Sequence, residues 1–346
     1  MTKHIHGGDV YKYDHCLDFS ANCNPLGTPQ SVKQAIIDSV EDLSDYPRVG
    51  CGPLKEAIAD YEHTKKEYLI CGNGAADLIF SLSRALNPKK ALLPAPTFAE
   101  YEQALVSVGC EISRYYLKEE NDFCIQKDYP DVLKREKPDI IFLCNPNNPT
   151  GITIPQDLLE EILETCAMQG IFMVVDECFL DFVKDPEKHT LKEKLAKYPG
   201  LFILKAFTKR YAIPGVRLGY GSVRTGKYLT GWSSHPAWNV STMAQQAGMA
   251  ALKEAEYVEA GRQIIFRESA WMKEKMRQVG LTVYPSEANY IFFYGPEDLF
   301  ERCVAKGILI RDCSNYLGLK KGYYRVAVKL HEQNEKLIEV LEEVLS

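Results

Sequence analysis

Residues 201–221 read LFILKAFTKRYAIPGVRLGYG, and this stretch indicates both a fold and a chemistry. The apolar run 201–204 is typical of a strand that is buried on both faces. Lys209 and Arg217 follow it, on either side of a Pro-Gly turn. A buried lysine amine forms Schiff bases with aldehydes, and a guanidinium matches the oxygens of a phosphate. The spacing therefore predicts an aldehyde cofactor that carries a phosphate group, and pyridoxal phosphate (PLP) is our candidate.

Short apolar runs alternate with helical patterns through the middle of the chain. The runs are apolar throughout rather than alternating, as strands covered on both faces are. Residues 157–169 carry leucine and isoleucine on one helical face, and Gly170 ends that pattern. This alternation predicts an α/β layered domain with a mostly parallel sheet. Besides 201–204, the expected strands are 91–93, 140–144, 171–175 and 218–221.

The C-terminal part follows a different pattern. A long amphipathic helix is predicted over 254–279, and it is followed by three strands and a closing helix, which indicates a smaller α+β unit. These strands are expected at 282–284, 290–294 and 324–328, and the helix at 333–345. We therefore predict an N-terminal arm (1–30) that joins the small domain and substrate site, a large PLP-binding domain (31–248) and a small domain (249–346).

The composition is that of an ordinary globular protein and excludes some classes of partner. The chain has 346 residues, of which 46% are hydrophobic and 25% charged, with a net charge of -6. Nucleic acids and anionic membrane surfaces both attract a cationic face, so neither is expected as a partner. Residues 1–9 contain no apolar run, so no secretory signal is expected, and the absence of a run of about 18 apolar residues predicts no membrane span. We expect a cytoplasmic enzyme.

Cysteine and histidine usage predicts neither disulfides nor a metal. The eleven cysteines include no Cys-x-x-Cys pair, and some, such as Cys144 and Cys178, lie in apolar segments. Reduced thiols in the core are the simplest interpretation. His4 and His6 are spaced like ligands on one face of a strand, but a terminal pair is usually solvated, so no metal is expected.

Three further clusters stand where predicted strands end. In open parallel sheets, ligands bind outside the carboxyl ends of the strands, so these clusters should converge. The first, GNGAAD at 72–77, opens a helix whose bare N–H groups attract anions. An ordinary capped turn is one alternative. A dinucleotide loop, and with it an NAD-dependent oxidoreductase, is another, although Asp77 replaces the third glycine of that pattern.

The other two clusters are the loop NPNNPTG at 145–151 and the pair Asp176-Glu177. Two prolines make the loop rigid, so the Asn148 amide is positioned to donate to a phenolate oxygen, with a plain turn as the alternative. A carboxylate at the end of an apolar strand is costly unless it is paired. The protonated ring nitrogen of PLP would pair with Asp176, whereas Glu177 should face the opposite way. A helix N-cap is the alternative for this pair.

With these clusters in this order, the chain resembles the fold-type I PLP enzymes of the aminotransferase class I/II family. The resemblance covers nearly the whole chain. It depends on four motifs that are highly specific together: N-P-N-N-P-T-G at 145–151, D-E at 176–177, T-K at 208–209 and G-x-R-x-G at 215–219.

The resemblance implies a role for each matching residue. Lys209 and Asp176 would be catalytic: Lys209 would hold the cofactor covalently, and Asp176 would pair with the ring nitrogen. Asn148 would donate to the ring hydroxyl oxygen, and Phe98 would stack on the ring. Tyr46 would reach the cofactor phosphate of a neighbouring subunit, which implies a homodimer with a shared active site. The expected phosphate-binding residues are Gly74, Ala75, Ala76, Thr208 and Arg217.

Within this family, the chain looks most like the threonine-phosphate decarboxylases of cobalamin biosynthesis. The similarity lies in H-G-G at 6–8, D-F-S-A-N-C-N-P-L-G at 18–27, P-T-F-A-E-Y at 96–101 and R-D-C at 311–313. It implies conversion of L-threonine O-3-phosphate to (R)-1-aminopropan-2-yl phosphate and CO2. Two arginines suit a substrate with a carboxylate and a phosphate. The expected substrate-binding residues are His6, Gly7, Asn22, Asn148, Arg311 and Arg325.

Two alternatives remain besides the oxidoreductase. Histidinol-phosphate aminotransferases use the same residues but usually carry Tyr where Phe179 stands. The outcome depends on whether the carboxylate or the α-hydrogen stands perpendicular to the ring, and Lys209 would remove that hydrogen as a general base. A non-catalytic protein of the same fold that binds PLP and serves as a regulator is the alternative from another class.

Three residues depart from the family pattern near the predicted lysine. Ala206 stands where a serine usually contacts the phosphate, so one hydroxyl contact is missing. Lys205 stands where these decarboxylases usually have arginine. Arg210 directly follows Lys209 at a position that is usually aromatic.

Overall fold

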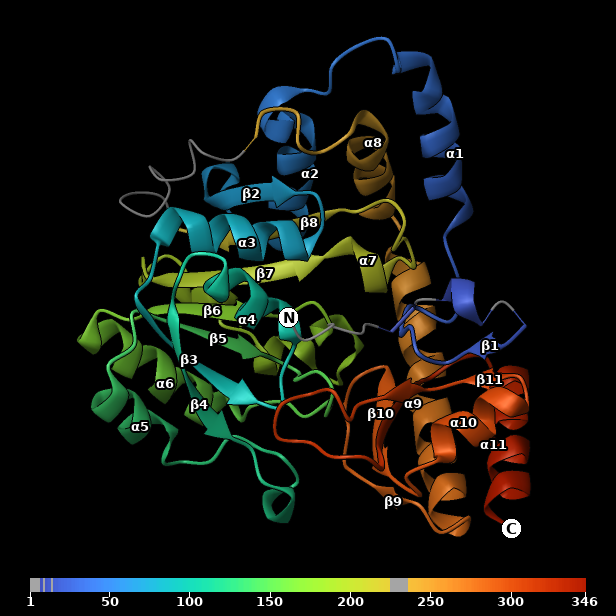
Figure 1. Ribbon diagram of the computed structural model, residues 1–346. Coiled ribbons are helices and arrows are strands. Elements are labelled where there is room, and N and C mark those ends of the chain that lie inside the picture. Colours follow the sequence, from blue (N-terminus) through green and yellow to red (C-terminus); the bar gives the residue numbers. More distant parts are fainter. Residues whose placement is uncertain (1–6, 9, 14, 225–235) are drawn as a thin grey trace.

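The computed structural model describes residues 7–8, 10–13, 15–224 and 236–346. Two sheets organise most of these residues: a seven-stranded sheet between helices and a smaller antiparallel sheet formed by the C-terminal part (Figure 1). His6, which was predicted to bind the substrate, lies outside the described residues, as does His4.

The large sheet is mostly parallel, which confirms the predicted α/β class. Only β8 runs against its neighbours within this sheet. All five apolar runs form strands of it. In spatial order, the strands are β2 (Leu69–Gly72), β8 (Gly219–Val223), β7 (Leu201–Ala206), β6 (Phe172–Asp176), β5 (Ile140–Cys144), β3 (Lys90–Ala95) and β4 (Glu111–Tyr116).

Helices cover both faces of this sheet, which explains why its central strands are apolar throughout. On β5, Ile140 and Phe142 pack with α3 and α4, whereas Ile141 and Leu143 pack with α5 and α6 on the other face. A third cluster joins α2 and α8 to β2 and β8. The helices are α1 (Gln30–Asp38), α2 (Gly52–Glu62), α3 (Ala75–Leu86), α4 (Ala99–Val106), α5 (Tyr129–Glu136), α6 (Gln156–Gln169), α7 (Phe207–Arg210) and α8 (Thr242–Ala251).

The C-terminal part has its own core, in which residues of three helices pack with an antiparallel sheet. β1 (Leu17–Asp18) of the N-terminal arm pairs with β11, so the arm is attached to this part of the molecule. The predicted division at 248–249 falls inside α8, and the domain bounds remain a prediction. The elements are α9 (Ala255–Gln278), β9 (Thr282–Val283), β10 (Tyr290–Tyr294), α10 (Leu299–Ala305), β11 (Ile308–Leu309), β12 (Arg311–Asp312), β13 (Tyr323–Ala327) and α11 (His331–Leu345).

Two strands of the large sheet were not predicted, and each has a physical reason. β4 is an edge strand, half-exposed along most of its length, so its sequence EISRYY contains no apolar run. β2 has only four residues and ends in the glycine that begins the 72–77 cluster. Short or edge strands carry a weak periodic signal.

The cysteines of the chain are free thiols. In the ranges that the structure covers, no helix is long and apolar enough to cross a membrane. The same ranges contain no group of three or more His, Cys, Asp or Glu side chains that could hold a metal ion.

Candidate active site

The carboxyl ends of β6 and β7, the loop after β5 and the start of α3 surround a cavity of about 240 Å³. These segments are far apart in the sequence, but parallel strands bring their ends to one edge of the sheet (Figure 1). The structure thereby brings together most of the predicted site residues. Those that line the cavity are Gly7, Asn22, Ala75, Ala76, Phe98, Asn148, Asp176, Thr208, Lys209, Arg217 and Arg325.

Gly74, Tyr46 and Arg311 were predicted in the site but are not among the residues that line this cavity. Tyr46 is 79% exposed and packs on Trp238 with ring centroids 4.7 Å apart, so it is not part of the cavity of its own chain. Arg311 is buried, and its guanidinium donates to the Asp312 carbonyl oxygen at 2.7 Å and to Asn315 Oδ1 at 2.9 Å. Some of the N–H donors of Arg311 are therefore already used in hydrogen bonds within the protein.

Lys209 lies on α7, a single helical turn that begins directly after β7. Its carbonyl oxygen accepts a hydrogen bond of 2.9 Å from the Asn24 backbone N–H, so the N-terminal arm holds this turn. Burial lowers the pKa of the Lys209 amine, and the positive charge of Arg325 lowers it further. A lowered pKa increases the fraction of neutral amine, which is the form that attacks an aldehyde.

Asp176 is the last residue of β6, and its carboxylate is buried. Oδ2 accepts a hydrogen bond of 2.6 Å from the Tyr101 hydroxyl, and Oδ1 accepts one of 2.9 Å from the Cys178 backbone N–H. Burial raises the pKa of Asp176, while these hydrogen bonds oppose the rise. None of the described cations forms an ion pair with Asp176. A cationic ring nitrogen in the cavity would supply that partner.

The first turn of α3 forms an anion cradle with Arg217. A Cβ at Gly74 would lie 2.5 Å from Arg217 Nη2, and one at Gly219 would lie 2.7 Å from the Ala75 nitrogen. Gly219 requires glycine because backbone atoms lie so close to it, and Gly74 requires glycine because its φ of +85° disfavours a side chain. The helix N-terminus and the guanidinium both favour a phosphate. Thr208 adds a hydroxyl at the edge of the same cavity.

Asn148 is oriented by its neighbours. Its Oδ1 accepts hydrogen bonds from Arg325 Nη1 and, at 3.3 Å, from the Tyr316 hydroxyl. Because a guanidinium has only donors, the amide oxygen must face Arg325. The Asn148 NH2 group is therefore free to donate to an oxygen bound in the cavity, as the ring hydroxyl of PLP would provide.

Two tyrosines of the site were missed as functional residues. Tyr101 binds Asp176 from α4, and Tyr316 binds Asn148 from the loop between β12 and β13. Tyr101 stands one helical turn after Phe98. Because residues three positions apart lie on the same side of a helix, this spacing could have indicated that Tyr101 lies near the site. Nothing in the local sequence of Tyr316 indicates its partner, since the contact spans 168 residues.

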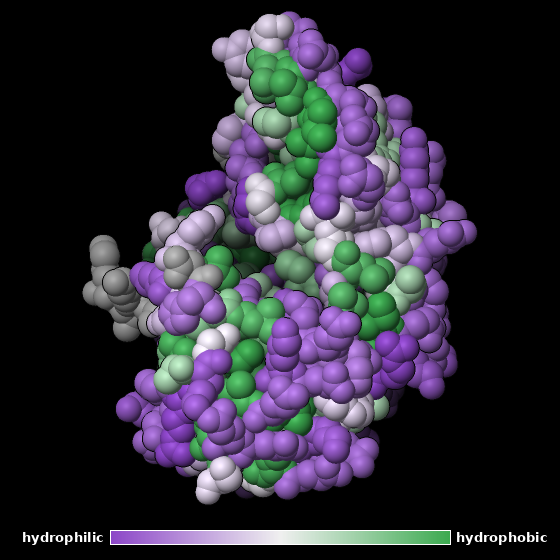
Figure 2. Space-filling model, turned by 90° about the vertical axis from the view of Figure 1, so that its right-hand side faces the viewer, coloured by the Kyte–Doolittle hydropathy of each residue, from purple (hydrophilic) through white to green (hydrophobic). Residues whose placement is uncertain are grey.

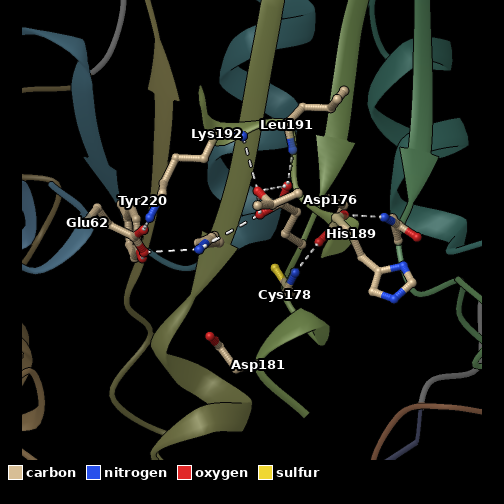
Figure 3. Close-up of polar contacts among 12 residues, drawn as sticks. Glu62, Asp176, Cys178, Asp181, His189, Leu191, Lys192 and Tyr220 are labelled. Atoms are coloured by element: carbon tan, nitrogen blue, oxygen red, sulfur yellow. Dashed lines mark hydrogen bonds and ion pairs between the residues drawn. The ribbon is translucent and has the colours of Figure 1, made fainter. Parts of the chain in front are cut away.

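Glu177 does not line the cavity, in agreement with its predicted orientation, and belongs to a buried polar cluster that includes Glu62 and Tyr220, both labelled in Figure 3. The Thr190 hydroxyl donates to Glu177 Oε1 at 2.8 Å, and Lys205 Nζ lies 3.8 Å from its Oε2. Burial raises the pKa of Glu177 to about 7, and the charge of Lys205 opposes the rise. Lys205 also donates to Glu62 at 3.0 Å. The lysine that departs from the family pattern is thus a member of this cluster.

The cavity fits PLP in each of its parts. A lysine with a lowered pKa can hold the aldehyde, and a buried carboxylate without an ion-pair partner can hold the ring nitrogen. Phe98 offers an aromatic face, and the glycine-lined cradle offers phosphate contacts. Ala206 also lines the cavity, so the missing serine hydroxyl leaves this cradle with one contact fewer.

A lysine, a buried carboxylate and an anion cradle at the strand ends of a mostly parallel sheet define a fold-type I PLP enzyme. The chain belongs to the aminotransferase class I and II family, whose sequence profile matches residues 14–341. This match confirms the family and fold predicted from the sequence, together with the PLP cofactor. It replaces the dinucleotide interpretation of residues 72–77.

The relatives include a threonine-phosphate decarboxylase and histidinol-phosphate aminotransferases. A threonine-phosphate decarboxylase of Salmonella typhimurium is 36% identical, over 99% of this chain and 96% of its own. A histidinol-phosphate aminotransferase of Methanosphaera stadtmanae is 29% identical, over 95% of this chain and 90% of its own. The crystal structure of a histidinol-phosphate aminotransferase from Clostridium acetobutylicum has a TM-score of 0.89 and 30% identity, and the match covers 95% of this chain and 99% of that one.

Proposed function

We propose that this protein is a PLP-dependent decarboxylase that converts L-threonine O-3-phosphate to (R)-1-aminopropan-2-yl phosphate and CO2. The observation that carries this proposal is the similarity, over 99% of the chain, to the decarboxylase of Salmonella typhimurium. A relative named as an adenosylcobalamin biosynthesis bifunctional protein, 30% identical over 98% of this chain, supports a place in cobalamin biosynthesis.

When bound, PLP supplies an aldehyde for the substrate amine and a ring that withdraws electrons from the bond that breaks. The residues of this chain hold and orient it. Asp176 keeps the ring nitrogen protonated, because a buried carboxylate without an ion-pair partner is stabilised by a cation. Asn148 donates to the ring oxygen, and the cradle of α3 and Arg217 holds the phosphate. Lys209 supplies a neutral amine that can take up and return a proton.

The substrate side of the cavity is rich in buried donors. Arg325 is buried and donates to the Ser20 carbonyl oxygen at 3.0 Å and to Asn148. Its Nε and the Nδ2 of Asn22 are buried and have no hydrogen-bond partner among the residues that the structure describes. Unpaired buried donors are costly, so an anionic substrate group is the partner that they favour. We infer that Arg325 and Asn22 bind one of the two anions of the substrate, with Gly7 beside them.

Phe179 supports decarboxylation over transamination of histidinol phosphate. Its ring lines the cavity and packs edge-on against Tyr290, with centroids 5.1 Å apart. The wall that it forms is apolar, whereas histidinol-phosphate aminotransferases usually present a tyrosine hydroxyl there. An apolar wall around a carboxylate favours loss of CO2, since the charge disappears from a site that solvates it poorly.

The test is incubation of the purified holoenzyme with L-threonine O-3-phosphate alone. We expect one molecule of CO2 to be released for each molecule of amino-alcohol phosphate formed, and no 2-oxo acid to be produced. Transamination of histidinol phosphate by 2-oxoglutarate, with no CO2 from threonine phosphate, would instead establish the aminotransferase. A protein that binds PLP but turns over neither substrate would establish the non-catalytic alternative.

We further propose that the active enzyme is a homodimer. Tyr46 is exposed and does not line the cavity of its own chain, as expected of a residue that serves a second subunit. Apolar residues also gather on the surface around α1, at the top of Figure 2. The exposed apolar side chains of this region are Ile37, Val40, Leu43 and Val49. A contiguous exposed apolar surface is typical of a protein interface.

We also infer that the enzyme is cytoplasmic, because eleven free thiols persist only in a reducing compartment. Appearance of the tagged protein in an oxidising compartment would contradict this.

A further inference from the structure

Arg210 is a buried cation at the position directly after Lys209. Its Nη1 lies 2.9 Å from Asp181 Oδ1, and both side chains are largely buried. The guanidinium also lies over the Tyr61 ring, 4.8 Å from its centroid, and donates to the Tyr61 hydroxyl. One side chain on α7 thus contacts α2 and the turn that follows β6.

The ion pair lies just beyond the point where the backbone pairing of β6 with β7 ends. The parallel ladder between β6 and β7 ends where Asp176 pairs with Leu204, and a last backbone bond joins the Glu177 N–H to the Leu204 oxygen at 2.8 Å. Beyond that point, the two segments diverge. Among the described residues, no backbone hydrogen bond joins residues 178–183 to residues 207–211. The Asp181–Arg210 pair is a side-chain link across this gap.

The two segments that it links carry the two predicted catalytic residues. Asp181 lies five residues after Asp176, on the turn below it in Figure 3. Arg210 is adjacent to Lys209, and its carbonyl oxygen accepts a buried hydrogen bond of 3.1 Å from Asn24 Nδ2. The α7 turn is therefore held by the backbone through Asn24 and by the side chain through Asp181.

We propose that Arg210, paired with Asp181, is a positioning residue that holds Lys209 in place relative to Asp176. This inference rests on the proposed PLP site, because it assigns Lys209 as the residue that holds the cofactor. Displacement of a reacting group by about 1 Å costs on the order of a hundredfold in rate. A single helical turn has few hydrogen bonds of its own to prevent such a displacement.

The test compares three variants of the holoenzyme with the wild type. Arg210→Met removes the cation and leaves Asp181 buried without it. Arg210→Met combined with Asp181→Asn removes both charges and so relieves that penalty. Arg210→Lys keeps the positive charge but lacks the planar guanidinium group with its several N–H donors. Each is measured for thermal stability, for kcat and KM, and for the fraction of Lys209 that carries a pyridoxyl group after borohydride reduction at limiting PLP.

For Arg210→Met we expect a lower melting temperature, a kcat reduced roughly tenfold or more with KM changed less, and a lower trapped fraction at Lys209. The double variant should recover the melting temperature but neither kcat nor trapping. Arg210→Lys should partly recover both kcat and the fraction of Lys209 that is trapped with a pyridoxyl group. If the role of Arg210 were purely structural, the double variant would recover kcat and the trapped fraction of Lys209 together with the melting temperature. That result would overturn the proposal.

The controls separate this proposal from the assignment of the site. If wild-type protein yields no pyridoxyl group on Lys209, then the PLP site itself is wrong. If the wild type is labelled and Arg210→Met is labelled and active to the same extent, then only the positioning role is wrong. Should Arg210→Met fail to fold, the double variant and Arg210→Lys decide the question by the same readouts.

Discussion

The Tyr101 hydroxyl donates a hydrogen bond of 2.6 Å to Asp176 Oδ2, and both groups are buried. This contact joins α4 to the end of β6 and opposes the rise in the pKa of Asp176 that burial causes. A hydrogen bond to the carboxylate stabilises its charged form, and the charged form is the one that pairs with a protonated ring nitrogen.

Tyr101→Phe should therefore weaken PLP binding and slow the reaction. Loss of a hydrogen bond to a charged group costs about 1.5–3 kcal/mol, so we expect a roughly tenfold or greater loss in PLP affinity. Equilibrium titration of the apoenzyme with PLP measures this change. Tyr116→Phe, at an exposed position on β4, is the matched control and should bind PLP like the wild type. Equal affinity of both variants would show that Tyr101 does not support Asp176.

Asp176→Asn should stabilise the apoenzyme at neutral pH while it abolishes activity. The pKa of Asp176 is raised in the folded state, so ionising this group destabilises the fold. The penalty is absent below the unfolded pKa of about 3.9, grows as pH rises toward the folded pKa and is constant above it. The melting temperature of the variant should thus exceed that of the wild type at pH 7, and the difference should vanish near pH 4. A difference that grows on acidification would contradict the assignment.

Lys209→Ala should lose the covalent link to PLP and keep the fold. The side chain lies in a cavity rather than in the core, so little packing is lost. Borohydride reduction and peptide mapping should find a pyridoxyl group on Lys209 in the wild type and none in the variant. Lys253→Ala, at an exposed site before α9, serves as the control and should be labelled at Lys209. A pyridoxyl group on another lysine of the wild type would show that Lys209 does not hold the cofactor.

Arg217→Ala should lower the affinity for PLP more than it lowers kcat at saturating PLP. The guanidinium approaches the backbone at Gly74, where a phosphate would sit. Loss of one charged hydrogen-bonding partner corresponds to about 2 kcal/mol, or roughly a thirtyfold increase in the Kd for PLP. Activity at saturating PLP should be largely restored. A variant with unchanged PLP affinity would exclude Arg217 from the phosphate site.

Leu43→Arg should dissociate the proposed dimer, because a charge would replace an exposed apolar contact between subunits. Sedimentation velocity should show a shift from dimer to monomer, and activity should fall because Tyr46 no longer reaches a neighbouring site. Met168→Arg is the control: this side chain is also exposed and apolar but lies on α6, away from α1 (Figure 1). If the wild type were monomeric and fully active, the proposal that the active enzyme is a homodimer would be wrong.

The sequence alone determined the class of fold and most of the cofactor site. Strands buried on both faces must be apolar throughout, so 140–144 and 201–204 were recognisable without any knowledge of their partners. Parallel pairing then required their carboxyl ends to meet at one edge, which is why Asn148, Asp176 and Lys209 could be placed in one site.

Only the tertiary structure decided which side chains support that site. The contact of Tyr101 with Asp176, that of Tyr316 with Asn148 and the ion pair between Arg210 and Asp181 join residues between 29 and 168 positions apart. Local sequence carries no periodic or turn signal for such pairs, because they depend on how separate elements pack against one another. Arg210 illustrates the difference: in the sequence it is a departure from a pattern, and in the fold it has a buried partner of opposite charge.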